Sequence, residues 1–299
     1  MTDGGVAARL LTGSSAAVRP YVEPHVGNDA HYCEYLSVGP DKALVGKRYT
    51  RREVLELAIK ASEVLSRTLG VGEFCIHYFT DNRFEDLVFR FGAVLAATTP
   101  VTVNWQADDD ARIAYKATVT SAKLALVDAG ANKAALPASV TVLDAKEALL
   151  SSVDTTGIDP PRCLSRCGTP TPEDTRIVIF TSGTTGKPKG VKLSYRAYEN
   201  NRHAFEDLLQ LQHRDLCLVA TNPFHHTNST ATTDWTLRKQ NSTLRLVQRY
   251  TTQYWKLIVA AAVGVPFGSA VPSFSTSMIT EEDAKDDAAA DGKPLVVCP

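Results

Sequence analysis

The sequence predicts an α/β fold built from mostly parallel sheets that are flanked by helices. Two observations carry this prediction: apolar runs of strand length alternate with helical stretches, and these runs are apolar throughout rather than at every second residue. Strands of that kind are typical of parallel sheets covered on both faces. The 299 residues, 44% hydrophobic and 22% charged, have the composition of a globular protein with a sizeable core.

The first half of the chain supplies the clearest strand and helix signals. Thr50 and Glu53 form a capping box, after which apolar residues recur at helical spacing. An apolar run over 74–79 predicts a buried strand, and Asp81 or Asn82 is expected to cap a second helix. The further expected elements are a helix from 108–110 to 117, strands over 124–128 and 140–143, and a helix over 145–150.

A stretch rich in proline, threonine and glycine over 154–175 predicts a linker. It would separate a first α/β subdomain, 29–153, from a partial second one, 176–265. The elements expected in the second subdomain are a strand over 176–180, a helix over 194–211, a strand over 216–221, a helix after 225–234, a strand over 243–247 and a helix over 251–262.

Both ends of the chain are expected to be disordered. Residues 1–28 carry Arg9 and Arg19 with few acids, a composition that also resembles an organelle transit peptide. Residues 266–299 hold six acids between Glu281 and Asp291 against one lysine, which predicts a disordered acidic tail.

Charge and cysteine content argue against several classes of function. A net charge of −1 gives no field for gripping nucleic acid, so no nucleic-acid partner is expected. The six cysteines lack paired C-x-x-C spacing, which favours free thiols in the cytoplasm, although Cys163 and Cys167 leave a zinc pair open. The longest apolar run, 257–268, is too short for a membrane span and is broken by Gly264 and Pro266. The oligomeric state stays open.

The segment that carries chemistry is the turn after the strand over 176–180. Its residues are Thr181, Ser182, Gly183, Thr184, Thr185, Gly186, Lys187, Pro188, Lys189 and Gly190. Glycines let backbone N–H groups approach a ligand, hydroxyls add donors and lysines add positive charge, which together suit a polyphosphate. It is not a Walker A loop, because proline follows Lys187 where that motif needs serine or threonine. By composition alone, a glycine-rich surface turn is the alternative.

This ordered string resembles the phosphate-loop signature of the adenylate-forming (AMP-binding) superfamily, which includes acyl-CoA synthetases, peptide-synthetase adenylation domains and beetle luciferase. The resemblance covers roughly 49–262. It implies ATP- and Mg²⁺-dependent activation of a small-molecule carboxylic acid to an acyl-adenylate, and transfer of the acyl group to coenzyme A. The residues that it implies for binding the β- and γ-phosphates are Thr181, Ser182, Gly183, Thr184, Thr185, Gly186 and Lys189.

The stretch 222–226, with the sequence Asn-Pro-Phe-His-His, is similar to the family's next motif, close to the acyl-substrate pocket. By the spacing P-x-x-H, His226 falls on the family histidine and is the expected catalytic residue, whereas His225 stands where an aromatic is usual. A structural histidine is the alternative. Adjacent residues on a strand point to opposite faces, which argues against a shared metal ion, and no metal ligand is assigned.

The sequence departs from the family after the phosphate loop. It lacks the aromatic-Gly-x-Thr-Glu segment that grips adenine and holds the metal in the family, the Thr-Gly-Asp segment for the ribose, and the late lysine that contacts the α-phosphate. We therefore expect a chain truncated near residue 262, with impaired transition-state stabilisation. The alternative is a non-catalytic ATP-binding remnant or interaction module.

Overall fold

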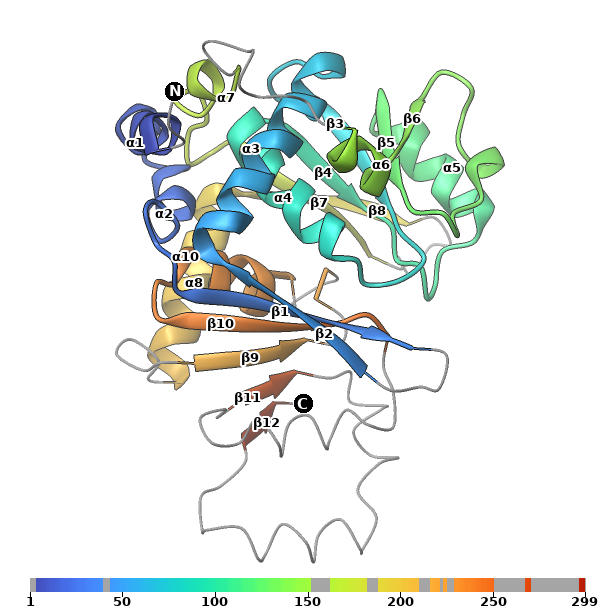
Figure 1. The fold of residues 1–299 in the computed structure, drawn as a ribbon. Helices are drawn as coiled ribbons and strands as arrows, with labels where there is room; N and C mark the ends of the chain where they lie inside the picture. The colour runs from blue at the N-terminus through green and yellow to red at the C-terminus, as the bar shows by residue number, and fades with distance from the viewer. Residues whose placement is uncertain are drawn as a thin grey trace, which may run out of the picture.

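The computed structural model describes residues 4–39, 44–151, 162–181, 188–209, 216–220, 223–224, 229–249, 267–269 and 296–298. Their strands form two six-stranded sheets, named A and B here, and helices α3 and α4 lie between the sheets (Figure 1). The strand order is β12-β11-β9-β10-β1-β2 in sheet A and β6-β5-β3-β4-β7-β8 in sheet B.

Sheet B is parallel except at one edge. Its strands are β3 (Phe74–Tyr78), β4 (Thr99–Thr102), β5 (Leu124–Val127), β6 (Thr141–Asp144), β7 (Thr175–Thr181) and β8 (Lys189–Ser194). Neighbours from β6 to β7 pair in parallel, and only the β7–β8 pair is antiparallel. The predicted α/β class with mostly parallel sheets is confirmed.

Sheet A joins the beginning of the chain to its end. Its strands are β1 (His31–Val38), β2 (Leu44–Thr50), β9 (Leu216–Ala220), β10 (Ser242–Val247), β11 (Phe267–Ser269) and β12 (Val296–Cys298). Within this sheet Cys33 pairs with Leu244 across the parallel β1–β10 ladder. The expected consecutive subdomains, 29–153 and 176–265, are therefore corrected: each sheet takes strands from both ranges, because hydrogen-bonded pairing between distant strands leaves no mark in sequence order.

The helices follow the sequence signals closely in the first half. Helix α3 (Arg51–Thr68) begins at the predicted capping box, in which the Thr50 side chain accepts a hydrogen bond from the Glu53 N–H. Helix α4 (Phe84–Ala96) begins later than expected, with Arg83 at the N-cap position and no side-chain cap. The other helices near predicted positions are α5 (Asp110–Val119), α6 (Ala145–Leu150), α8 (Tyr195–Leu209) and α10 (Trp235–Arg238). The helix expected over 251–262 lies outside the described residues.

The main hydrophobic core lies between the sheets. Side chains of α3 and α4 pack there against Leu244 of sheet A and Leu126 of sheet B. Gly92 permits the close approach of the two helices, since a Cβ at that position would lie 2.7 Å from the Ala61 Cβ. Helix α5 covers the opposite face of sheet B through Ile113, so this sheet is buried on both faces.

Residues 4–28 form helices and turns with buried side chains, which corrects the expectation of disorder for this part of 1–28. Helices α1 (Gly4–Gly13) and α2 (Arg19–Val22) precede β1 and bury Leu10 and Tyr21. The two ring nitrogens of His25 lie 3.1 Å from the Arg51 carbonyl oxygen and 2.9 Å from the Leu237 carbonyl oxygen, and the N–H of the neutral ring donates to one of them. These contacts join the N-terminal segment to the main core. The sequence did not reveal them, because the segment shows no clear amphipathic pattern.

Two other expected irregular segments are partly described. Helix α7 (Arg162–Arg166) lies inside the expected linker and buries Cys163 in the main core, whereas 154–161 lies outside the described residues. Strands β11 and β12 lie inside the expected acidic tail and pair with each other. The other residues of 266–299 lie outside the described part of the chain.

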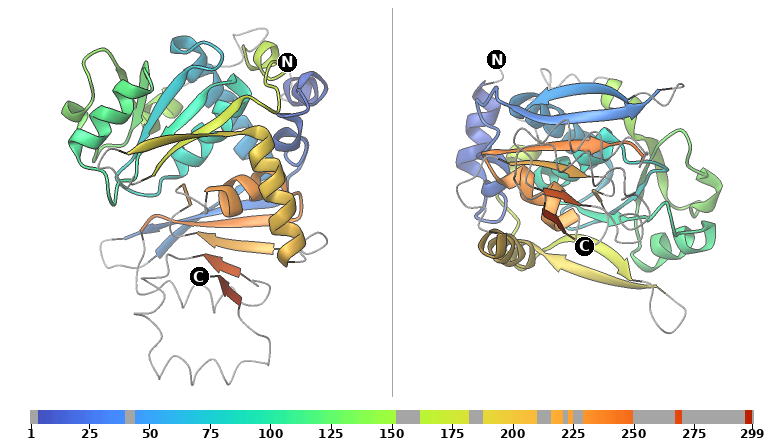
Figure 2. Two further views of the ribbon diagram at one scale, coloured as in Figure 1. Left: turned by 180° about the vertical axis from the view of Figure 1, so that it is seen from behind. Right: turned by 90° about the horizontal axis from the view of Figure 1, so that it is seen from below.

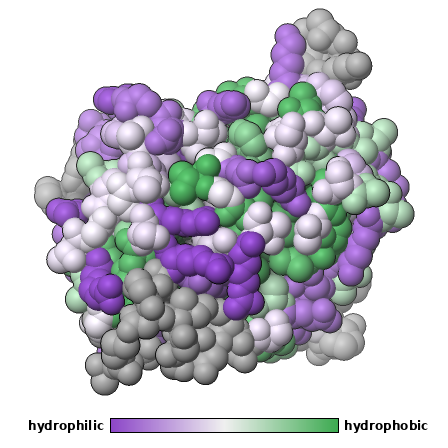
Figure 3. Space-filling model, turned by 90° about the horizontal axis from the view of Figure 1, so that it is seen from above, coloured by the Kyte–Doolittle hydropathy of each residue, from purple (hydrophilic) through white to green (hydrophobic). Residues whose placement is uncertain are grey.

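The described surface is mixed in character. Hydrophilic and hydrophobic side chains are interspersed over the face seen from above (Figure 3). Large exposed apolar side chains come from separate elements, for example Val45 of β2, Val119 of α5 and Leu208 of α8. Within the described ranges, no helix is long and apolar enough to cross a bilayer.

Candidate functional site at the carboxyl edge of the sheets

The ends of the phosphate-loop segment lie at the turn end of the β7–β8 hairpin, where the chain passes from one strand to the other. Thr181 is the last residue of β7, Lys189 is the first of β8, and the two are register partners. Both side chains are exposed, and the Thr181 hydroxyl donates to the Lys189 carbonyl at 3.5 Å. The five predicted phosphate-binding residues between them, Ser182, Gly183, Thr184, Thr185 and Gly186, lie outside the described residues.

Gly190 lets Phe180 and Val178 of β7 pack closely against the backbone of β8. A Cβ at Gly190 would lie 3.0 Å from the Phe180 ring and 3.3 Å from Val178. Phe180 is itself buried in the core between sheet B and α5. The glycine in the motif therefore has a packing role in addition to any contact with a ligand.

The carboxyl ends of the parallel strands form one edge, and Thr181 belongs to it. Ligands of open α/β sheets bind at this edge. Thr80 and Asp81 follow β3, and Asp128 follows β5. The Thr80 hydroxyl donates to Asp128 at 2.9 Å, and the Arg83 Nε donates to the same carboxylate at 3.1 Å. Burial alone would lower the pKa of Arg83, but the hydrogen bond to Asp128 raises it.

The same edge connects sheet B to sheet A. The Gln248 Nε2, just beyond β10, donates to Asp81 at 3.0 Å, and Arg249 pairs with the same carboxylate. The Asn82 side chain donates to the Val247 carbonyl at 3.0 Å. Asp81 and Asn82 are occupied by these contacts, which explains why neither caps α4. The sequence held no signal for this connection, because its partners are more than 160 residues apart.

The histidine-bearing segment follows β9. Neither His225 nor the predicted catalytic His226 is among the described residues, but the two residues before them are. Phe224 is buried, with the Arg90 guanidinium 4.9 Å from its ring centroid. The Pro223 carbonyl accepts a hydrogen bond from the Thr233 hydroxyl. The chain is therefore fixed immediately before the histidines.

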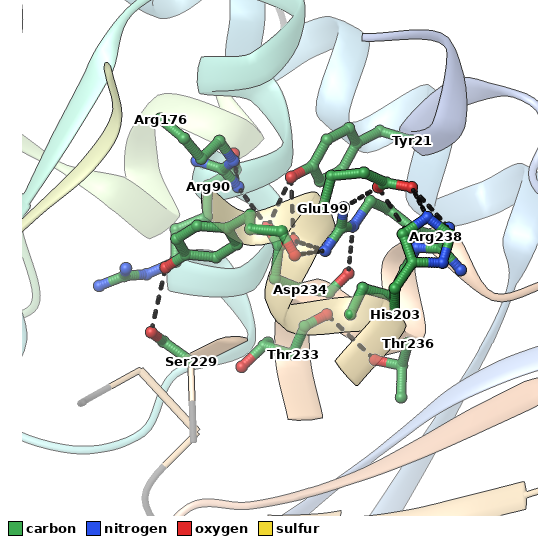
Figure 4. Close-up of polar contacts among 12 residues, drawn as sticks. Tyr21, Arg90, Arg176, Glu199, His203, Ser229, Thr233, Asp234, Thr236 and Arg238 are labelled. Atoms are coloured by element: carbon green, nitrogen blue, oxygen red, sulfur yellow. Dashed lines mark hydrogen bonds and ion pairs between the residues drawn. The ribbon is translucent and has the colours of Figure 1, made fainter. Parts of the chain in front are cut away.

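The residues after the histidines form a π-helix, Ser229–Asp234, which leads into α10. Helices of this type often occur at functional sites. Ser229 lies 3.3 Å from the hydroxyl of Tyr198 on α8, the helix that directly follows β8 (Figures 2 and 4). The segment is thus tied to the same hairpin that carries the phosphate-loop residues.

Asp234, the last residue of the π-helix, lies in a buried polar cluster (Figure 4). Its carboxylate accepts from the Tyr21 hydroxyl at 2.9 Å and pairs with Arg238 at 3.0 Å and Arg176 at 3.3 Å. Burial raises the pKa of the Tyr21 hydroxyl, which therefore keeps its proton and donates. Burial opposes the charged form of Arg176, but Tyr21 and Asp234 raise its pKa above the ordinary value.

A second buried cluster contacts the Phe224 ring through Arg90. The Arg90 Nε donates to Asp86 at 2.8 Å, and the His77 Nδ1 lies 2.7 Å from the same carboxylate. Burial lowers the pKa of His77, which favours the neutral ring. Burial alone would raise the pKa of Asp86, yet Arg90 and His77 together lower it. Arg90 is therefore held rigidly where it contacts the Phe224 ring.

Other candidate sites are less well supported. A cavity of about 710 Å³ lies over Arg238 beside α2, but Glu199 already bridges its Arg202 and Arg238 side chains, and none of its lining residues comes from the carboxyl edge. Cys163 and Cys167 are buried free thiols. In the part of the chain that the structure describes, no three His, Cys, Asp or Glu side chains are grouped to hold a metal ion.

Comparison with known proteins agrees with the phosphate-loop motif. The model of a family described as AMP-binding enzymes matches residues 35–296. A long-chain-fatty-acid–CoA ligase, FadD13 of Mycobacterium tuberculosis, is 26% identical over 166 residues, covering 54% of this chain and 31% of that protein. Gramicidin S synthase 2 of Brevibacillus brevis is 27% identical over 184 residues, covering 60% of this chain and 4% of that protein. The chain thus spans a third or less of the length of these relatives.

Solved structures share the fold. O-succinylbenzoate coenzyme A synthetase of Bacillus subtilis, in complex with AMP, has a TM-score of 0.70 and 16% identity, covering 87% of this chain and 63% of that one. The N-terminal domain of FACL13 of Mycobacterium tuberculosis has a TM-score of 0.69 and 18% identity, covering 90% and 66%. Because the family model matches most of the chain, this protein belongs to the AMP-binding enzyme family.

Proposed function

We propose that the protein binds ATP at the turn end of the β7–β8 hairpin and activates a carboxylic acid as its acyl-adenylate. The observation that carries the proposal is the exposed pair Thr181 and Lys189, which flanks a glycine- and hydroxyl-rich segment at the carboxyl edge of sheet B. Family membership supports it, as do the relatives whose names describe CoA ligases and synthetases.

The donor set fits the phosphates of ATP. The Lys189 ammonium supplies a positive charge in solvent, and Thr181 supplies a hydroxyl beside it. In the proposed reaction the acid attacks the α-phosphate and pyrophosphate leaves, so these groups, with Ser182 to Gly186, would stabilise the charge on the leaving group. Mg²⁺ would share that charge when bound. His226 would lie beside the acid, and coenzyme A would accept the acyl group.

A pyrophosphate exchange assay tests the activity. The purified protein is incubated with Mg-ATP, labelled pyrophosphate and a panel of fatty and aryl acids, and acid-dependent incorporation of label into ATP is the expected result. Incorporation that stays at background with every acid would contradict adenylate formation by this chain.

A second candidate is a non-catalytic ATP-binding or interaction module. An ATP-binding module of this kind would show a melting temperature raised by Mg-ATP together with background exchange. A melting temperature that Mg-ATP leaves unchanged would contradict ATP binding in both candidates.

A further inference from the structure

Tyr21 brings the N-terminal helix α2 into contact with the segment that follows the histidines. Its hydroxyl lies within 3.0 Å of both carboxylate oxygens of Asp234, although the two residues are 213 positions apart. Tyr21 is 1% exposed, so bulk water cannot replace this hydroxyl as a donor. The residue also lies before the family-model match, which begins at residue 35.

Two described routes lead from Asp234 to Phe224. In the first, the neighbouring Thr233 hydroxyl bonds the carbonyl of the residue before Phe224. In the second, Asp234 pairs with Arg176, and the Arg176 Nη2 donates to the Arg90 carbonyl at 3.3 Å. The Arg90 guanidinium then contacts the Phe224 ring. The first route ends at Pro223 and the second at Phe224, the two residues that directly precede the histidines.

The buried charges make this network sensitive to Tyr21. Asp234 shares two oxygens among Tyr21, Arg176 and Arg238, and all these side chains are almost fully buried. Loss of the hydroxyl would leave the carboxylate with the two guanidiniums alone. Because ion pairs in a buried site depend strongly on geometry, Asp234 is then expected to move towards them and to carry Thr233 with it.

We propose that Tyr21 is a positioning residue for the carboxylic acid substrate, acting through Asp234 on the anchors of the histidine-bearing segment. The proposal rests on the adenylate-forming function above. Tyr21 touches no substrate in this role, and it meets the β7–β8 hairpin at Arg176, near the end of β7 that lies away from Thr181 and Lys189. The acid and ATP should therefore respond differently when the hydroxyl is removed.

The test compares Tyr21→Phe with Tyr78→Phe. Tyr78 is a matched control, because it is buried and its hydroxyl accepts a hydrogen bond from the Asn132 N–H at 3.0 Å in the other core. The pyrophosphate exchange assay gives KM for the acid and for ATP separately. Hydrogen exchange read by mass spectrometry compares the peptide 223–234 with the peptide 189–194 of the hairpin. Thr233→Val is a second variant that removes the hydroxyl bonded to Pro223.

In Tyr21→Phe and Thr233→Val, KM for the acid should rise about tenfold while KM for ATP stays within twofold, and exchange should quicken in 223–234 only. Tyr78→Phe should change neither KM. Unchanged exchange in 223–234, or equal rises in both KM values, would overturn the proposal. Background activity of the wild type would instead contradict the proposed function, and the exchange comparison would still decide whether Tyr21 holds the segment.

Discussion

The turn end of the β7–β8 hairpin, at Thr181 and Lys189, differs from the buried cluster around Asp234 in both exposure and origin. The turn end comes from one continuous stretch of chain, and the Thr181 and Lys189 side chains are exposed. The cluster draws Tyr21, Arg176 and Asp234 from distant segments and buries all of them. The groups that we propose to meet a charged ligand are accessible, whereas the groups of the buried cluster are paired with one another away from water.

The largest expected effect comes from breaking the buried cluster. Asp234→Ala would leave Arg176 buried without its carboxylate and Arg238 with Glu199 alone, and breaking a buried pair in this way typically costs about 3–5 kcal/mol of unfolding free energy. Urea unfolding of the wild type and the variant measures this cost. The control is Glu173→Ala, which removes an exposed pair with Arg196 and should cost about 1 kcal/mol or less. Equal losses in the two variants would show that burial does not separate the regions.

A substitution at the turn end of the β7–β8 hairpin should change activity rather than stability. Lys189→Ala removes one positive charge aimed at solvent, and we expect the pyrophosphate exchange rate to fall by about two decades. Its unfolding free energy should stay within about 0.5 kcal/mol of the wild type. Lys192→Ala is the matched control, since it removes another exposed lysine of the same strand, one that lies over the Phe74 ring. Similar rates in the two variants would remove Lys189 from the site.

The contrast between these variants also shows what the sequence could predict. The capping box at Thr50, the strand before Thr181 and the phosphate-loop motif are local patterns, and each was readable from neighbouring residues. Strand β8 was not, because it is an exposed edge strand without an apolar pattern. The Asp81 contacts with Gln248 and Arg249 and the Tyr21 contact with Asp234 were not readable either, since they depend on the packing of distant segments.

A smaller effect should follow pH through the N-terminal anchor. Burial and the nearby Arg51 lower the pKa of His25 from 6.5 to about 3. The unfolded chain therefore binds a proton below about pH 6.5 that the folded chain refuses, so stability is full above that pH and is lost as pH falls. His25 should contribute up to about 1.4 kcal/mol per pH unit between pH 6.5 and 3.

Unfolding free energies of the wild type and His25→Gln at several pH values measure that contribution. The variant should be less stable at neutral pH, because the ring bonds to Arg51 and Leu237 are disturbed, but its stability should fall less steeply between pH 6 and 4 than that of the wild type. Parallel curves for the two proteins would show that His25 does not titrate between the folded and unfolded states in this way.

Calorimetric binding of Mg-ATP to the wild type, Lys189→Ala and Lys192→Ala tests most directly whether the β7–β8 hairpin holds the nucleotide. We expect the wild type to bind Mg-ATP, Lys189→Ala to weaken the affinity at least tenfold, and Lys192→Ala to stay within twofold of the wild type. Equal affinity in all three proteins, or no binding to the wild type, would contradict nucleotide binding at this hairpin.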